Sequence, residues 1–209
     1  MTINILHNHF HFTCHGLAYW EEQKALLIAD VHLGKISHFR KYGSAVPQNA
    51  IQKNFDRLDE AVKEFQPQKI IFLGDLFHSA LNMEWNLFES WVKFQSAEII
   101  LITGNHDIIS PLRFEGIGVE VIPQLHMGRF RLTHHPEEKE GTFNICGHIH
   151  PGYRLSGMGK QHLKLKCFFQ SQNQLILPAF GEFTGVYVMK PNENEKVYVC
   201  TNTNVIQVA

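Results

Sequence analysis

Residues 98–107 read EIILITGNHD, and this stretch decides the fold. The part from Glu98 to Thr103 is a nearly continuous aliphatic run, and the polar residues GNHD follow it directly. Such a run is typical of a strand that is buried on both faces. Polar residues just after a strand lie on the loop that leaves the sheet, where α/β proteins hold their ligands. The stretch therefore predicts a strand with a chemical site at its end.

Three other stretches of the chain repeat this arrangement of an apolar run followed by glycine, aspartate or histidine. They are ALLIA at Ala25–Ala29 before Asp30, KIIFL at Lys69–Leu73 before Gly74-Asp75, and FNIC at Phe143–Cys146 before Gly147. A glycine at such a place lets the backbone turn sharply off the strand, because it has no Cβ to clash. We expect these loops to gather at one edge of the structure.

The segments between these strands predict helices. The first lies between Pro47 and Pro67, where apolar residues recur at spacings of three and four: Ile51, Phe55, Leu58, Val62 and Phe65. The second spans about Glu84–Gln95. After Pro151, short apolar runs separated by polar turns predict strands. We find no linker and no internal repeat, so the sequence predicts one α/β domain over residues 1–209.

Composition excludes some classes and leaves others open. The net charge is -1, which is lower than expected for a protein that binds nucleic acid by phosphate neutralisation alone. Four scattered cysteines predict small buried side chains and a reducing compartment. The sequence shows neither a signal peptide nor an apolar run long enough for a bilayer, so we expect a cytoplasmic protein without a membrane partner. The 14 histidines point to a metal site.

Polar residues at or beyond five strand ends carry the chemistry. They are Asp30-x-His32, Gly74-Asp75, Gly104-Asn105-His106-Asp107, His134 after the run Arg129–Thr133, and Gly147-His148-x-His150. Gathered at one edge, they form a cluster of carboxylates that repel one another and of imidazoles that lack partners. Divalent cations neutralise the carboxylates and provide a partner for every imidazole lone pair. The set therefore predicts a metal site.

This ordered set resembles the calcineurin-like metallophosphoesterases, and the match runs from Asp30 to His150. The resemblance implies a sandwich of two mixed β-sheets flanked by helices, with the metal site on loops at the strand ends. It implies that one metal is held by Asp30, His32 and His150, the other by Asn105, His134 and His148, and both by Asp75. His135 remains an alternative to His134, because adjacent residues at a strand end point to opposite faces and only one can face the site.

The same resemblance implies the reaction. His106 occupies the position that protonates the leaving oxygen, and Asp107 the position that orients it. Two metals about 3.5–4 Å apart hold a bridging hydroxide that attacks phosphorus in line. Imidazole, carboxylate and amide ligands suit Mn, Fe or Zn better than Ca or Mg. We expect two divalent transition-metal ions, with Mn first and Fe or Zn left open.

Flanking blocks resemble one subfamily, the DNA ligase-associated metallophosphoesterases. The blocks are LLIADVHLGK at 26–35, FRKYG at 39–43, GDLFHS at 74–79, GHIHP at 147–151 and LPAFGEFTG at 177–185. Val186 departs from the pattern, where a second glycine is expected. The resemblance implies a DNA endonuclease or phosphodiesterase that acts in DNA repair with a ligase and a helicase. A phosphatase or dinucleoside polyphosphate hydrolase uses the same metals and is the alternative; a non-catalytic scaffold fits the intact histidines poorly.

Basic residues and one further histidine are candidates for contact with substrate. Lys35 and Arg40 belong to a basic cluster, with His38 and Lys41, just after the Asp30 motif, and His78 follows Asp75 by three residues. The alternative for each is a solvated surface position. Four more basic residues beyond Pro151 extend a positive rim if they face the site: Arg154, Lys160, Lys164 and Lys166.

Overall fold

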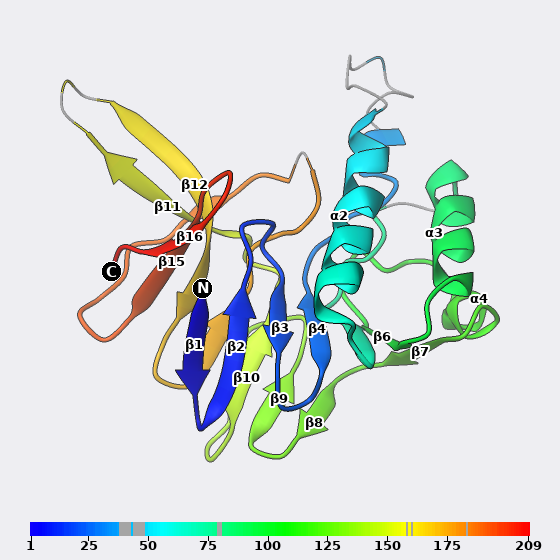
Figure 1. Ribbon diagram of the computed structural model, residues 1–209, viewed down its shortest axis with the longest axis horizontal. Coiled ribbons are helices and arrows are strands. Elements are labelled where there is room, and N and C mark those ends of the chain that lie inside the picture. Colours follow the sequence, from blue (N-terminus) through cyan, green and yellow to red (C-terminus); the bar gives the residue numbers. More distant parts are fainter. Residues whose placement is uncertain (38–42, 44–48, 79–80, 158, 160, 183) are drawn as a thin grey trace.

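Two β-sheets packed face to face, with helices on the outside of one of them, make up the fold (Figure 1). This computed structural model describes residues 1–37, 43, 49–78, 81–157, 159, 161–182 and 184–209. The predicted cluster residues His38, Arg40 and Lys41, together with Pro47 and Lys160, lie outside these ranges.

The first sheet has seven strands in the order β1-β2-β3-β4-β5-β6-β7. Their bounds are β1 Thr2–Ile5, β2 Asn8–Phe12, β3 Ala18–Trp20, β4 Ala25–Ile28, β5 Lys69–Phe72, β6 Glu98–Ile102 and β7 Val119–Ile122. Strands β1 to β4 are antiparallel, whereas β4 to β7 run parallel. Because β4, β5 and β6 are parallel neighbours, the loops that follow them leave the same edge of the sheet. The prediction from the apolar runs is confirmed.

The second sheet has the strand order β14-β11-β12-β13-β10-β9-β8, with β15 and β16 joined to it through β12. Its strands are β8 Leu125–Met127, β9 Phe130–Leu132, β10 Phe143–Cys146, β11 Pro151–Ser156, β12 His162–Gln170, β13 Gln174–Ile176, β14 Tyr187–Val188, β15 Lys196–Cys200 and β16 Val205–Gln207. Both sheets are mixed, so the predicted sandwich is confirmed.

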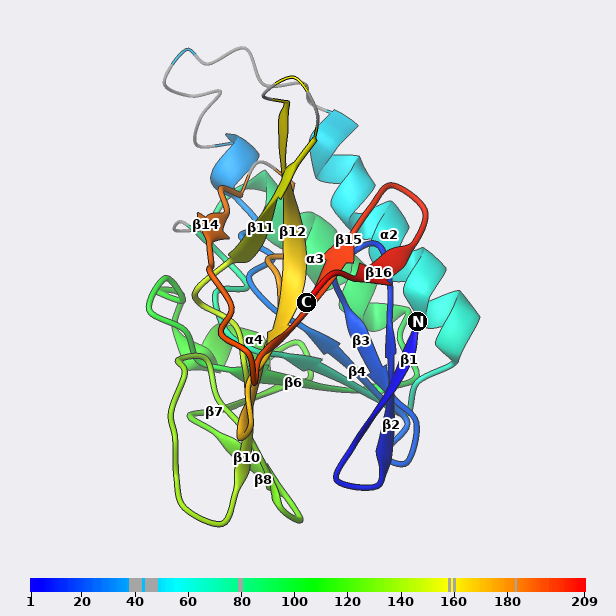
Figure 2. The same ribbon diagram turned by 90° about the vertical axis from the view of Figure 1, so that its left-hand side faces the viewer.

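The helices lie on one face of the first sheet (Figures 1 and 2). They are α2 Asn49–Phe65, α3 Met83–Lys93 and α4 Pro111–Glu115. The stripe predicted on α2 is confirmed, because Ile51, Phe55 and Leu58 are buried in the core under this face. Within the described residues, no helix has the length and apolar character needed to cross a membrane.

The buried apolar residues form three clusters. One lies between α2, α3 and the first sheet, and includes Phe72 and Phe88. The second lies between the two sheets, where Phe12 stacks on Phe168 with ring centroids 3.9 Å apart. The third covers the outer face of the second sheet. All four cysteines are free, and burial raises the pKa of Cys167 and Cys200 to about 12.

Candidate metal centre

All seven predicted metal ligands meet where the strands β4, β5, β6, β9 and β10 end. The loops after these strands come from both sheets, so the site lies across the edge of the sandwich. Six of the seven appear in groups whose ligand atoms lie within 4.8 Å of one another, and the seventh, Asn105, contacts one of the six. Sequence positions from Asp30 to His150 are therefore brought to one place.

The first group consists of Asp30, His32 and His150. The Nε2 atoms of His32 and His150 are 3.2 Å apart, and Nε2 of His150 is 3.3 Å from Oδ1 of Asp30. Burial, with the neighbouring His150 and Lys35, lowers the pKa of His32 to about 2. The imidazole of His32 is therefore neutral, as a metal ligand has to be.

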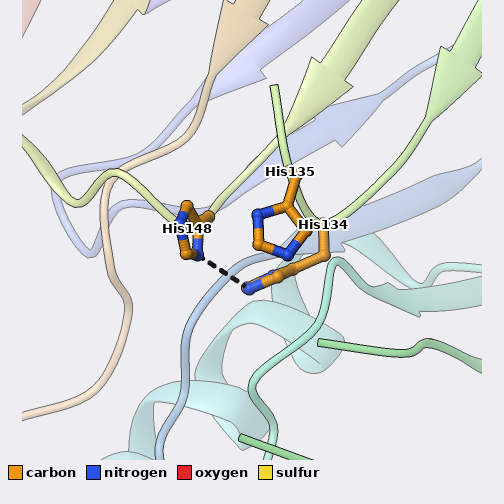
Figure 3. A group of neighbouring side chains, drawn as sticks. All are labelled: His134, His135 and His148. Atoms are coloured by element: carbon orange, nitrogen blue, oxygen red, sulfur yellow. Dashed lines mark hydrogen bonds between the residues drawn. The ribbon is translucent and has the colours of Figure 1, made fainter. Parts of the chain in front are cut away.

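The second group is built around His134, whose ring points toward His148 (Figure 3). Nδ1 of His134 lies 2.9 Å from the carbonyl oxygen of Leu73 and donates its proton to it. Its Nε2 lies 3.0 Å from Oδ1 of Asn105 and 3.2 Å from Nδ1 of His148. Burial, with the charges of His135 and His134, lowers the pKa of His148.

Asp75 lies between the two groups. Its Oδ2 is 3.9 Å from Nε2 of His32, and its Oδ1 is 3.4 Å from Nε2 of His134. The two oxygens of one carboxylate thus face different sets of imidazoles. Oδ1 also accepts a hydrogen bond from the backbone N–H of His106, at 2.9 Å, which holds the carboxylate in place. This arrangement suits a carboxylate that contacts two cations.

Both His134 and His135 lie close to His148, although adjacent residues at a strand end are expected to point to opposite faces. The strand β9 ends at Leu132, so the alternation of a strand no longer applies to the pair. The ring of His135 lies 4.1 Å from that of His148, centroid to centroid, and Figure 3 shows all three rings together. Yet His134 is buried and contacts Asn105 and Asp75, whereas His135 is exposed. The preference for His134 therefore stands on its contacts.

The donor atoms of the site fit divalent cations. Carboxylate oxygens of Asp30 and Asp75 lie within 4.8 Å of each other, and among the described residues the only basic side chains within 4.0 Å of them are histidines. Oδ1 of Asp30 is buried and accepts no hydrogen bond from the described part of the chain. Lone pairs that face lone pairs at about 3 Å repel unless a cation lies between them. The residues therefore suit metal ions.

The backbone at the site is strained. Five of the seven proposed ligands have a positive φ, which side-chain-bearing residues rarely adopt: Asp30 (53°), His32 (51°), Asp75 (50°), His148 (69°) and His150 (53°). Such conformations each cost on the order of 1–3 kcal/mol and cluster where function demands them. Here the strained turns direct consecutive ligands toward one point.

The glycines that precede the ligands do not all serve the role expected from the sequence. Gly74 has a φ of 83° and turns the chain, as predicted. At Gly104 and Gly147, glycine is needed because there is no room for a Cβ atom. A Cβ on Gly104 would lie 2.2 Å from Oδ1 of Asp75, and one on Gly147 would lie 2.5 Å from Oδ2 of Asp30. These two glycines let the buried carboxylates approach the neighbouring loop.

His106 and Asp107 lie on the loop after β6, at the side of the first group. The ring of His106 is 5.6 Å from that of His32 and 4.8 Å from that of His78, between centroids. The carboxylate of Asp107 accepts hydrogen bonds from the backbone N–H groups of Gly104 and Phe77. Burial raises its pKa, against these two hydrogen bonds, which lower it. Asp107 thus fixes the loop that carries His106.

Of the three candidate substrate-binding residues nearest the metal motifs, Lys35, Arg40 and His78, two are described. His78 lies beside His32 and His106. Lys35 is half-buried next to the first group, where its charge helps to lower the pKa of His32, and burial lowers its own pKa. Arg40 lies outside the described residues.

Sequence reasoning missed two supports of the site. Glu84, at the start of α3, is fully buried and accepts hydrogen bonds from the backbone of Gly34 and Ser37, which holds the chain after His32. Its place two residues after the helix N-cap Asn82 was the available signal. Gly181 packs so closely on the Asp30 loop that a Cβ would lie 2.1 Å from the Val31 carbonyl oxygen.

A two-sheet sandwich with imidazole, carboxylate and amide groups at its strand ends defines a metal-dependent phosphoesterase. The model of the calcineurin-like phosphoesterase family matches residues 24–168, and the chain belongs to this family. No curated protein matches the chain in sequence.

Two solved structures illustrate the likeness. The chain is similar to the nuclease MPE of Pseudomonas putida, with 26% identity and a TM-score of 0.83, over 99% of both chains. It is also similar to Yfce, a phosphoesterase from E. coli, with 14% identity and a TM-score of 0.42, over 88% of this chain and 98% of the other.

A methyl group at Gly104 tests the packing of Asp75. In Gly104→Ala, the new Cβ meets both the side chain and the backbone of Asp75, so one loop has to move. We expect the free energy of unfolding to fall by about 1–3 kcal/mol, with loss of bound metal. The matched control is Gly185→Ala, where a Cβ meets nothing within 4 Å. Denaturant unfolding and metal analysis measure both effects; equal metal content in the two variants contradicts the packing argument.

Proposed function

We propose that this phosphoesterase is a DNA-cleaving phosphodiesterase, an endonuclease that acts in DNA repair. The observation that carries the proposal is the carboxylate of Asp75, whose two oxygens face separate imidazole sets. That geometry suits two metal ions on one phosphodiester. The preference for DNA is supported by the likeness to a nuclease along the whole chain and by the flanking sequence blocks.

In this proposal the ligands divide as the contacts suggest. Asp30, His32 and His150 would hold one ion, Asn105, His134 and His148 would hold the other, and Asp75 would contact both. Two such ions supply positive charge for the phosphoryl oxygens and an activated water for in-line attack. Mn suits this donor set, as do Fe and Zn.

The protein's own groups complete the reaction. His106 lies beside the first group, where its imidazole can give a proton to the departing alkoxide oxygen. Asp107 acts through the backbone: its hydrogen bonds to Gly104 and Phe77 hold the loop on which His106 sits. His78 and Lys35 flank this point and contact the substrate beside its scissile phosphate. A DNA ligase and a helicase are the proposed partners, on the basis of the subfamily resemblance.

A panel of substrates tests the proposal. We expect the Mn-loaded protein to hydrolyse a chromogenic phosphodiester and to cut single-stranded DNA. Chelation should abolish both activities, and so should Asp75→Asn, which weakens the binding of both ions. The control is Glu89→Gln, a change to a half-buried carboxylate of α3 that pairs with Lys93, and it should leave both rates unaltered.

Two results would count against the proposal in different ways. Full activity after exhaustive removal of metal would contradict the metal mechanism. A protein that hydrolysed only phosphomonoesters or dinucleoside polyphosphates, and cut no form of DNA, would favour the alternative phosphatase or dinucleoside polyphosphate hydrolase.

The proton donor is tested by its dependence on the leaving group. His106→Ala should slow DNA cleavage by roughly 10²–10⁴-fold, since an alkoxide needs protonation to leave. Hydrolysis of a nitrophenyl diester should fall much less, because nitrophenolate leaves unaided. The variant should keep its metals and its melting temperature. The control is His126→Ala, a change to an exposed residue of β8. An equal loss on both substrates would instead indicate that His106 positions the substrate.

A further inference from the structure

The hairpin formed by β11 and β12 extends away from the body of the protein (Figures 1 and 2). Its first strand begins at Pro151, the residue directly after the proposed ligand His150. Its far part is not needed for the core, because the residues from His162 to Lys164 are exposed. The hairpin therefore starts at the metal centre and reaches into solvent.

The register of the hairpin separates two faces. Arg154 is opposite Lys164, and Ser156 is opposite His162, so these four side chains share one face. The hydrogen bond between Ser156 Oγ and His162 Nδ1, at 3.1 Å, agrees with this pairing. We call the face that carries these four side chains the cationic face: Arg154, Ser156, His162 and Lys164. The other face is apolar and carries Tyr153, Leu155, Leu163 and Leu165.

The charges of the cationic face are not neutralised within the described protein. Arg154 and Lys164 are exposed and directly opposite each other, and like charges in such a pair are destabilising. Neither forms an ion pair with a described residue, although cations elsewhere do, such as Lys69 with Glu98 and Arg131 with Glu137. The pairing of Arg154 with Lys164 costs stability and leaves both cations without an ion-pair partner among the described residues. These two cations are therefore suited to bind an anion from outside the protein.

The position of the cationic face relates that anion to the metal centre. Lys166, next along the same face of β12, donates a hydrogen bond to the carbonyl oxygen of His15. It lies close to Gly16, which Pro178 also approaches. Three residues after Pro178, Gly181 packs on the Asp30 loop. Arg154 is four residues beyond His150, which is about 13 Å along a strand. A polymer of phosphates can reach both places, whereas a small diester cannot.

We propose that the cationic face of the β11–β12 hairpin binds the sugar–phosphate backbone of a polynucleotide strand whose scissile phosphate lies at the metal centre. This inference deepens the proposed function and rests on it. Arg154 and Lys164 each contact one phosphate, and they direct the strand along the hairpin. The nearly neutral net charge of the chain then agrees with local rather than global attraction of DNA.

The test compares two double variants of the full-length, Mn-loaded protein. Arg154→Gln/Lys164→Gln removes the pair, and Lys63→Gln/Lys139→Gln removes two exposed charges elsewhere. Stopped-flow anisotropy of a labelled single-stranded oligonucleotide measures binding before cleavage, over a range of salt concentrations. Hydrolysis of bis(p-nitrophenyl) phosphate reports on the metal centre, and sedimentation with phosphatidylglycerol vesicles reports on membranes.

We expect the hairpin variant to bind the oligonucleotide several-fold more weakly. The slope of log affinity against log salt should become less steep by about 1.4, because two phosphate contacts are lost. Its rate on the small diester should match that of the control variant. Three results would overturn the inference: no binding difference between the two variants, parallel loss on the small diester, or loss of vesicle binding alone. If the native protein binds the oligonucleotide through this pair and cuts none, the proposed function fails, and the placement of a scissile phosphate at the metal centre fails with it. A hairpin variant that binds normally while the native protein cuts DNA instead overturns the inference and leaves the proposed function intact.

Discussion

Two buried carboxylates that lie within 4.8 Å of each other are the constraint on which the rest of the structure depends. At that distance two negative charges repel by about 3 kcal/mol, for an effective dielectric constant of about 20. Among the described residues, Asp30 and Asp75 receive backbone hydrogen bonds from His148 and His106, but no ion pair from lysine or arginine. Divalent cations bound there would remove the repulsion and would connect the loops of both sheets.

The sandwich provides the setting for these carboxylates at a cost in local strain. Parallel strands deliver Asp30, Asp75 and Asn105 to one edge, and the second sheet delivers three further residues across it: His134, His148 and His150. Positive φ angles at five ligand positions turn the donor atoms inward. Since the surrounding packing holds these conformations, the site is formed by the fold before any substrate arrives.

Much of this was predictable from the sequence. The buried parallel strands and the stripe of α2 followed from apolar periodicity, and the gathering of carboxylates and imidazoles at one edge followed from the motifs at the strand ends. Their division between two metals is what the family resemblance implies. What could not be predicted depends on contacts between distant segments. The need for glycine at positions 104 and 147 arises from carboxylates on other loops, and the approach of His135 to His148 arises because β9 ends early. Glu84 looked like an ordinary polar residue at a helix start, yet it is buried against the chain after His32.

Anomalous X-ray scattering from crystals of the Mn-loaded protein tests directly whether Asp75 joins two metal ions. If it does, two anomalous peaks about 3.5–4 Å apart are expected. One should lie among Asp30, His32 and His150, the other among Asn105, His134 and His148, with the carboxylate of Asp75 between them. A single peak, or two peaks of which one is not in contact with Asp75, would contradict it.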